Sequence, residues 1–281
     1  MARRSFDSGP AVSTSDLSLG YPAHAGQRPF LAVEGVSVDL PRGGVLALLG
    51  ESGSGKSTLA RYLAGRGGDG DKQARIQQAG GEAVVLGAPI DRLSRRDRAG
   101  LTLRVGHLSQ EAGARLAPEL NVGDLLFEPL LERSKRIDRE AFGEIIAEMM
   151  DLVALPLVKL QSFPYELSKG QRQRVAVVRS LMLEPALVIA DEPTLGVDAT
   201  HRPRIVDLLA WYRKRTGASM VLVSHDIGML EALAERVVIM QQGRAVGRGD
   251  IDSIFRQSEH AYVRRLAEAL RSTAYDEIAE E

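Results

Sequence analysis

The segment Gly50-Glu-Ser-Gly-Ser-Gly-Lys-Ser57 limits the possible folds of this chain more than any other part of the sequence. It matches G-x-x-x-x-G-K-[ST] at every fixed position, follows the apolar run Val45–Leu49 and opens a helix predicted from about Lys56 to Gly65. Glycines let the backbone N–H groups of such a loop point at phosphates, and the helix dipole adds to the attraction. The sequence therefore predicts a phosphate-binding loop at the edge of a parallel sheet.

The loop predicts a nucleotide site with Mg²⁺. Lys56 would reach the β- and γ-phosphates, and the Ser57 hydroxyl would ligate the metal. Lys56 is one of only six lysines among 36 basic residues, and arginine's planar fork would not easily replace its compact ammonium. The residues expected around the phosphates are Gly50, Glu51, Ser52, Gly53, Ser54, Gly55, Lys56, Ser57 and Thr58.

The apolar run Leu187–Ala190 is followed by two carboxylates, Asp191 and Glu192, which are candidates for a second part of the site. Sites in open α/β sheets lie at the carboxyl ends of the strands, so two carboxylates here are well placed for chemistry. We expect Asp191 to hold Mg²⁺ through water and Glu192 to act as the base that polarises the attacking water. By itself the pattern is also compatible with a strand that runs into an acidic turn.

The order of apolar runs predicts an α/β chain. Alternating strands and helices after residue 185 favour a parallel sheet covered by helices, and residues 110–184 read as an inserted helical block. Strands are also expected at Ala83–Leu86 and Leu101–Leu108, and a helix at Ile227–Arg236. The expected organisation is a flexible leader at 1–16, an ATPase domain at 17–250 and a helical tail at 251–281, with 17–109 and 185–250 forming the core of the domain.

Composition excludes several classes of protein. The chain has no cysteine, which removes disulfides, thiolate metal sites and iron–sulfur clusters. A formal net charge of −1 gives no sign of a nucleic-acid partner. No apolar stretch approaches the roughly 18 to 20 residues of a spanning helix, so we expect any membrane association to depend on partners.

The segment Leu167-Ser-Lys-Gly-Gln171 resembles the signature of ABC ATPases, usually Leu-Ser-Gly-Gly-Gln, and lies the expected distance before Asp191. This resemblance, which spans about residues 17–250, implies a P-loop NTPase core with an antiparallel β subdomain and an inserted helical subdomain. It also implies roles for four further residues: Gln110 as the Q-loop ligand of Mg²⁺, Asp198 as the D-loop aspartate, His225 as the switch histidine at the γ-phosphate, and Tyr21 as the aromatic that stacks on adenine, with Phe30 as its alternative.

In this family two such domains pack head to tail, with ATP between the P-loop of one and the signature of the other. Ser168, Gly170 and Gln171 would therefore bind the nucleotide held by a second ATPase subunit, identical or different. The geometry agrees, because Ser168 and the Gly170 amide open a helix and present donors to a phosphate. Lys169 replaces the usual glycine, and it either points to solvent or adds a charge contact across the interface.

The segments Ser162-Phe-Pro-Tyr-Glu-Leu-Ser and His260-Ala-Tyr-Val resemble those of oligopeptide, dipeptide and nickel importer ATPases. Departures are a missing proline in the tail, the absent cysteine cluster and Leu195-Gly-Val-Asp in place of Ser-Ala-Leu-Asp. The resemblance implies an ATPase at the cytoplasmic face of the membrane, with two permease subunits and a solute-binding protein. The alternatives are a non-transport ABC ATPase and a catalytically weak half of a heterodimer.

Overall fold

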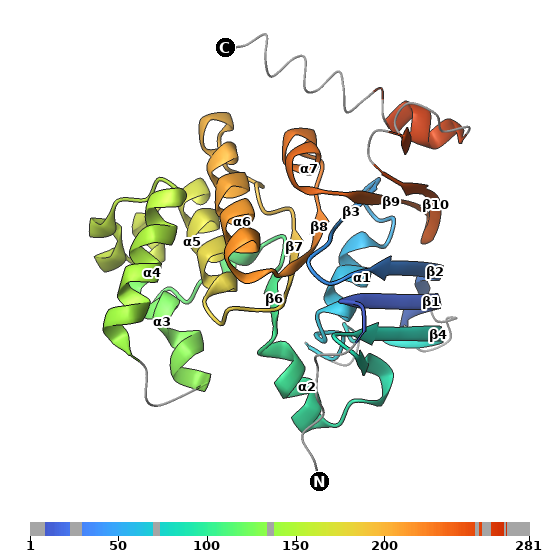
Figure 1. The fold of residues 1–281 in the computed structure, drawn as a ribbon, viewed down its shortest axis with the longest axis horizontal. Coiled ribbons are helices and arrows are strands. Elements are labelled where there is room, and N and C mark those ends of the chain that lie inside the picture. Colours follow the sequence, from blue (N-terminus) through green and yellow to red (C-terminus); the bar gives the residue numbers. More distant parts are fainter. Residues whose placement is uncertain are drawn as a thin grey trace.

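The computed structural model describes residues 9–22, 30–69, 74–133, 138–250, 253–254, 260–266 and 268. Its strands form two separate sheets, as Figure 1 shows. The four-stranded sheet has the order β2-β1-β4-β5, with β1 (Val12–Tyr21), β2 (Phe30–Leu40), β4 (Gln77–Val85) and β5 (Ala88–Pro89). The six-stranded sheet has the order β10-β9-β3-β8-β7-β6, with β3 (Val45–Gly50), β6 (Val105–Leu108), β7 (Leu187–Asp191), β8 (Ser219–Val223), β9 (Arg236–Gln241) and β10 (Arg244–Gly249).

The helices lie mostly between these strands in the chain. They are α1 (Lys56–Leu63), α2 (Arg95–Thr102), α3 (Val122–Arg133), α4 (Arg139–Leu152), α5 (Lys169–Leu181), α6 (Arg202–Thr216) and α7 (Ile227–Leu233). Single 3₁₀ turns are η1 (Ile90–Arg92), η2 (Ala112–Arg115), η3 (Leu157–Gln161), η4 (Pro164–Glu166) and η5 (Ala199–His201). The helices α3, α4 and α5 all fall between β6 and β7, and Figure 1 places them together to one side of the six-stranded sheet.

The six-stranded sheet sets the position of the site. Strand β3 pairs in parallel with both β8 and β9, and β7 pairs in parallel with β6 and β8, while β10 is antiparallel to β9. Every residue of β3, β7 and β8 is buried, as expected for parallel strands covered on both faces. Because these strands run in one direction, the P-loop after β3, Asp191 in β7 and the turn after β8 all leave the same edge.

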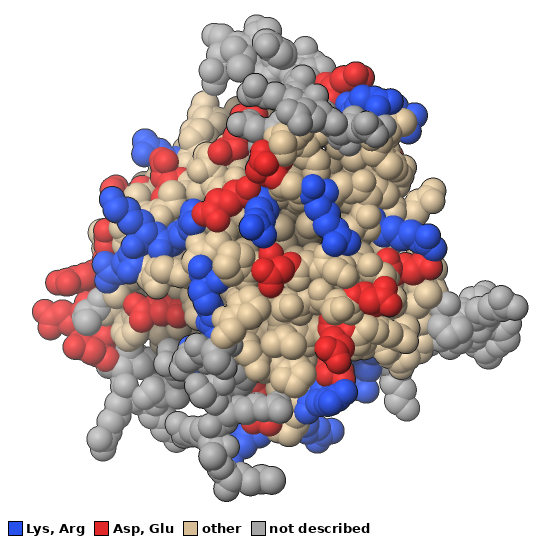
Figure 2. Space-filling model, turned by 45° about the vertical axis from the view of Figure 1, so that its right-hand side comes forward, with Lys and Arg blue, Asp and Glu red and all other residues tan. Residues whose placement is uncertain are grey.

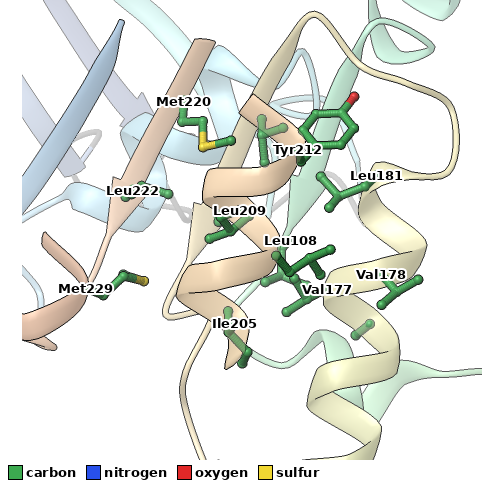
Figure 3. Packing of buried hydrophobic residues seen from close by; sticks show 14 of the residues in the cluster. Leu108, Val177, Val178, Leu181, Ile205, Leu209, Tyr212, Met220, Leu222 and Met229 are labelled. Atoms are coloured by element: carbon green, nitrogen blue, oxygen red, sulfur yellow. The ribbon is translucent and has the colours of Figure 1, made fainter. Parts of the chain in front are cut away.

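Two apolar cores cover the two faces of this sheet. On one face, residues from α5, α6 and α7 pack against the strands, and Figure 3 shows Leu108, Val177, Ile205, Leu209 and Met220 meeting there. On the other face, α1 and the four-stranded sheet pack against side chains such as Leu46 and Val221. The predicted parallel core, antiparallel β subdomain and helical insertion are thus confirmed.

Three sequence predictions need correction. Residues 12–16 belong to β1, not to a leader, because Val12 and Thr14 pair with β2 and are buried. The expected strand Leu101–Leu108 is split: Leu101 lies on the buried side of α2, and only Val105–Leu108 forms β6. The helix expected at Ile227–Arg236 stops at Leu233, because Arg236 pairs in register with Leu46 as the first residue of β9.

Only part of the predicted C-terminal helical tail falls within the described residues. Residues 261–266 are helical, and Tyr262 and Val263 are buried. Residues 1–8 of the predicted leader lie outside the described part of the chain, as does every residue of the tail beyond residue 268.

Two surface properties bear on partners. None of the helices in the described residues combines the length and apolarity needed to cross a membrane. On the face seen in Figure 2, basic side chains are interspersed with acidic ones. Such mixing contrasts with the clustered basic residues of nucleic-acid-binding surfaces.

Candidate nucleotide site

The P-loop fits closely between two strands of the core. At Gly50 the φ angle is +141°, and a Cβ would lie 2.0 Å from the carbonyl oxygen of Met240 in β9. At Gly55 the φ angle is +98°, and a Cβ would lie 2.2 Å from the carbonyl oxygen of Ala32 in β2. Both positions therefore require glycine, because any side chain would collide with backbone that cannot move without breaking a strand.

Lys56 lies folded back into the loop that contains it. Its ammonium donates hydrogen bonds to the carbonyls of Gly50 (2.6 Å) and Glu51 (2.7 Å) and to the Ser54 hydroxyl (3.3 Å). Burial lowers the pKa of Lys56, while the carboxyls of Glu192 and Asp191 oppose that shift. Gly55 is the N-cap of α1 and supplies no side-chain cap, so the first N–H groups of this helix are left for a ligand.

Three oxygen donors face the same pocket from different elements. Ser57 opens α1, Gln110 follows β6 and Asp191 ends β7, and all three line the pocket. Burial raises the pKa of Asp191, and its hydrogen bond with Ser57 and the charge of Lys56 act against that rise. Mg²⁺ is usually bound by one or two carboxylates together with phosphate oxygens and water, so a site with the single carboxylate of Asp191 fits the metal.

Glu192 has a strained backbone and a perturbed carboxyl. Its φ angle is +51°, a conformation that costs a non-glycine residue about 1–3 kcal/mol. Its backbone N–H donates to the carbonyl of Val223 at 2.7 Å, which ties it to the end of β8. The carboxyl contacts His225 Nε2 at 3.4 Å and accepts from the Ser224 hydroxyl at 3.5 Å. Burial raises its pKa to about 7, in the range suited to a general base.

Gln173 is a residue that the motif analysis did not single out. Its side chain is buried and donates to the backbone carbonyls of Glu192 (3.3 Å) and Pro193 (3.2 Å). Its amide oxygen accepts from the N–H of Gly113, three residues after Gln110 (3.3 Å). Gln173 thus links α5, the segment after β6 and the strained end of β7. The segment Gln171-Arg-Gln-Arg174 is polar throughout, so the sequence carried no signal that Gln173 would be buried.

Both candidates for the adenine-stacking aromatic line the pocket. Tyr21 and Phe30 are direct partners across β1 and β2. The Tyr21 hydroxyl hydrogen-bonds with the Thr58 hydroxyl at 3.1 Å, whereas the Phe30 side chain is 65% exposed. The two rings therefore mark one wall of the pocket, and the choice between them stays a prediction.

The signature residues lie apart from this pocket. Ser168 is the N-cap of α5. Its hydroxyl accepts a hydrogen bond from the backbone N–H of Gln171 (3.2 Å), and the side-chain oxygen of Gln171 accepts one from the backbone N–H of Ser168 (2.9 Å). Gly170 is buried, and a Cβ added to it would lie 3.1 Å from the carbonyl oxygen of Gly196. The methylenes of Lys169 pack over Gly196, where a Cβ would lie 2.7 Å from Lys169 Cε. The expected opening of the helix is present, and Lys169 bends toward the segment after β7.

Asp198 acts as a cap in this structure. Its carboxylate accepts from the N–H of His201 (3.2 Å), from the Thr200 hydroxyl (2.6 Å) and lies 2.6 Å from His201 Nδ1. The hydrogen bond with the Thr200 hydroxyl is the main cause, and that with His201 the second, that holds the pKa of Asp198 below its usual range. Within one chain, Asp198 therefore shapes the turn into α6 and does not line the pocket.

The structure brings most predicted site residues together. The pocket is lined by Tyr21, Ser52, Gly53, Gly55, Lys56, Ser57, Thr58, Gln110, Asp191, Glu192 and His225. The described residues Gly50, Glu51 and Ser54 support the loop without lining the pocket, through their bonds to Lys56. Ser168, Gly170, Gln171 and Asp198 are not among its lining residues.

Comparisons with known proteins agree with this geometry. Residues 33–195, more than half of the chain, match the family model described as ABC transporter. The dipeptide transport ATP-binding protein DppF of Escherichia coli is 34% identical over 92% of this chain and 76% of its own length. The oligopeptide transport ATP-binding protein OppF of Lactococcus lactis is 29% identical over 93% and 80%.

Solved structures show the same fold. The dimeric ATP-binding cassette MJ0796 bound to ADP and Pi has a TM-score of 0.74 and 24% identity over 85% of this chain and 98% of that one. The cassette cbiO1 from Clostridium perfringens, part of the complex cbiONQ, has a TM-score of 0.71 and 24% identity over 97% and 99%. Because the family model covers more than half of the chain and DppF is 34% identical to it, the chain belongs to the ABC transporter family and is an ATPase similar to the ATP-binding proteins of oligopeptide and dipeptide transport.

Proposed function

We propose that this chain hydrolyses MgATP as half of a paired ATPase and thereby drives import of peptides, or of a related small solute such as nickel. The observation that carries this proposal is that the pocket and the signature helix lie at separate places on the chain. Lys56, Asp191, Glu192 and His225 gather in one pocket, whereas the signature helix α5 presents its N-terminus elsewhere on the chain. A second subunit would complete each site, and the nucleotide-bound cassette of similar fold is dimeric.

The chemistry of the pocket follows from the groups it holds. The P-loop N–H groups and Lys56 would bind the β- and γ-phosphates, and Ser57, Gln110 and Asp191 would hold Mg²⁺, whose charge would offset that of the phosphates. Glu192 would accept a proton from the water that attacks the γ-phosphorus. His225, whose pKa is lowered by burial, would be neutral at pH 7 and would hydrogen-bond a γ-phosphate oxygen.

Transport requires contact with membrane subunits. We propose that short cytoplasmic helices of two permeases dock in the region Gln110–Leu126, and that a solute-binding protein completes the complex at the cell membrane. Gln173 supports this placement, because it joins Gly113 in that region to the backbone of Glu192. A movement at the docking region would therefore reach the backbone of Glu192 through the hydrogen bonds of Gln173.

The absence of native cysteine allows a direct test. A single thiol is placed in the docking region with Glu119→Cys, and a control thiol on β4 with Glu82→Cys; both side chains are exposed. After co-expression with the permeases, a cross-linker that reacts with the thiol at one end and is photoreactive at the other should join the permease to the Glu119→Cys chain alone. Cross-linking from both positions or from neither would contradict the docking site.

Fractionation and turnover test the alternatives. With its permeases the chain should fractionate with membranes, and an equal distribution with and without them would favour a non-transport ABC ATPase. Activity of the assembled complex should fall strongly on Glu192→Gln in this chain. Unchanged activity would favour the catalytically weak half of a heterodimer, although Lys56, Glu192 and His225 are all present.

A further inference from the structure

The C-terminal segment contacts the P-loop through one buried tyrosine. Tyr262 is 4% exposed, and its hydroxyl accepts a hydrogen bond from the backbone N–H of Glu51 at 2.7 Å. The two residues are 211 positions apart in the sequence. Neither the motif set nor the family model, which ends at residue 195, gives this tyrosine a role.

The bonded N–H belongs to the peptide unit that also holds Lys56. The carbonyl of that unit is the carbonyl of Gly50, which accepts from Lys56 Nζ at 2.6 Å. Because a peptide unit is planar, fixing its N–H also fixes the direction of its carbonyl. The Tyr262 hydroxyl and the Lys56 ammonium therefore hold opposite sides of one rigid group.

The tyrosine is itself held firmly by its neighbours. Val263 is fully buried, and Ile254 is nearly so. A Cβ on Gly247 in β10 would lie 3.2 Å from Ile254 Cδ1 and 3.3 Å from Val263 Cγ2, so both side chains pack directly on that strand. Figure 1 shows the described part of this segment beside β9 and β10. The segment thus fixes the hydroxyl relative to the sheet that carries the loop.

We propose that Tyr262 is a positioning residue for nucleotide binding, which orients the Gly50–Glu51 peptide and, through it, the Lys56 ammonium. The C-terminal segment is then part of the ATP site, although it lies outside residues 33–195, which the family model matches. This inference rests on the proposed role of Lys56 in binding the β- and γ-phosphates.

The substitution Tyr262→Phe tests the proposal, because it keeps the ring and removes only the hydroxyl. Binding of MgATP and MgADP to the full-length chain is measured by calorimetry, and KM and kcat in the assembled transporter. We expect Kd and KM to rise about three- to tenfold, the range given by the net free energy of one hydrogen bond. The value of kcat should change by less than about twofold, because the lost interaction serves bound substrate and transition state alike.

Two matched variants separate the hydroxyl from general destabilisation. Tyr212→Phe removes another buried hydroxyl, which donates to the carbonyl of Pro185 at 2.9 Å, away from the loop. Val85→Ala truncates a fully buried side chain of β4, which belongs to the other apolar core and leaves the C-terminal segment unchanged. Both should lower the melting temperature and leave Kd and KM for MgATP near the wild-type values.

The outcomes decide between the proposal and its rivals. A selective rise in Kd and KM for Tyr262→Phe supports it. Wild-type Kd and KM for Tyr262→Phe would overturn it, and so would an equal rise for Val85→Ala, which would assign the effect to general destabilisation. Lys56→Ala is measured in parallel: unchanged nucleotide affinity in that variant would overturn the P-loop assignment itself, whatever Tyr262 does.

Discussion

Nε2 of His225 lies 3.4 Å from Oε1 of Glu192, at the point where β7 and β8 end side by side. The contact is not a fixed ion pair, because burial raises the pKa of Glu192 to about 7 and lowers that of His225. Each group therefore favours its neutral form when no nucleotide is bound. A carboxyl group with a pKa near 7 can accept a proton from water when it is ionised. The neutral imidazole beside it can donate a hydrogen bond to a phosphate oxygen.

The substitution Glu192→Gln should separate binding from hydrolysis. An amide keeps the shape of the carboxyl but accepts no proton, so turnover should fall at least about a hundredfold, the scale of losing a general base. Affinity for MgATP should be retained, and an ATP-bound pair of subunits should accumulate in size-exclusion chromatography. Hydrolysis near the wild-type rate would show that Glu192 is not the base.

The raised pKa of Glu192 predicts a dependence of stability on pH. The folded protein holds this proton up to about pH 7, whereas the ordinary value is 4.5. The contribution of the raised pKa is therefore fully present below pH 4.5 and is lost as pH rises through 7. At pH 8 the nucleotide-free Glu192→Gln variant should be more stable than the wild type by roughly 3 kcal/mol.

Urea unfolding at a series of pH values measures this difference. The gap between variant and wild type should close toward pH 4.5. A gap of constant size across the range would mean that the carboxyl of Glu192 titrates at its ordinary value in the folded protein. Far-ultraviolet circular dichroism at each pH checks that both proteins start from the folded state.

Gln173 should position Glu192 without contacting nucleotide. Gln173→Met keeps a similar volume but removes the bonds to the carbonyls of Glu192 and Pro193, so buried polar groups lose partners at a cost of about 1–3 kcal/mol in stability. We expect kcat to fall about tenfold with little change in Kd for MgATP. Gln78→Met in β4, which removes bonds to Tyr62 and Gly81, is the control and should leave kcat unchanged. Equal loss of kcat in both variants would contradict the positioning role.

Lys169 offers a test of the signature across the subunit interface. Its methylenes pack over Gly196, so Lys169→Met preserves the packing and removes the charge, whereas Lys169→Gly removes both. If the ammonium binds the partner's ATP, both substitutions should weaken ATP-driven pairing at low salt and have less effect at high salt. If only the packing matters, Lys169→Met should pair like the wild type at every salt concentration. Analytical ultracentrifugation with MgATP in the Glu192→Gln background measures the pairing.

Local sequence patterns were sufficient to predict the fold class and most of the residues that line the pocket. Each motif carries its own local requirement: Gly50 and Gly55 must adopt backbone angles closed to other residues, and Asp191 and Glu192 follow an apolar run long enough for one buried strand. Parallel strands then bring their carboxyl ends to one edge, so the gathering of Lys56 with these carboxylates could be predicted from motif order.

Other features depend on packing between elements that are distant in the sequence, and local patterns do not specify them. The apolar residues of Leu101–Leu108 suit a strand or a buried helix face, and only packing divides them between α2 and β6. The positive φ of Glu192 and its bond from Gln173 require α5 and β7 to meet. The bond from Glu51 to Tyr262 joins residues 211 positions apart, and no local pattern encodes it, because its energy exists only once the C-terminal segment packs on β10.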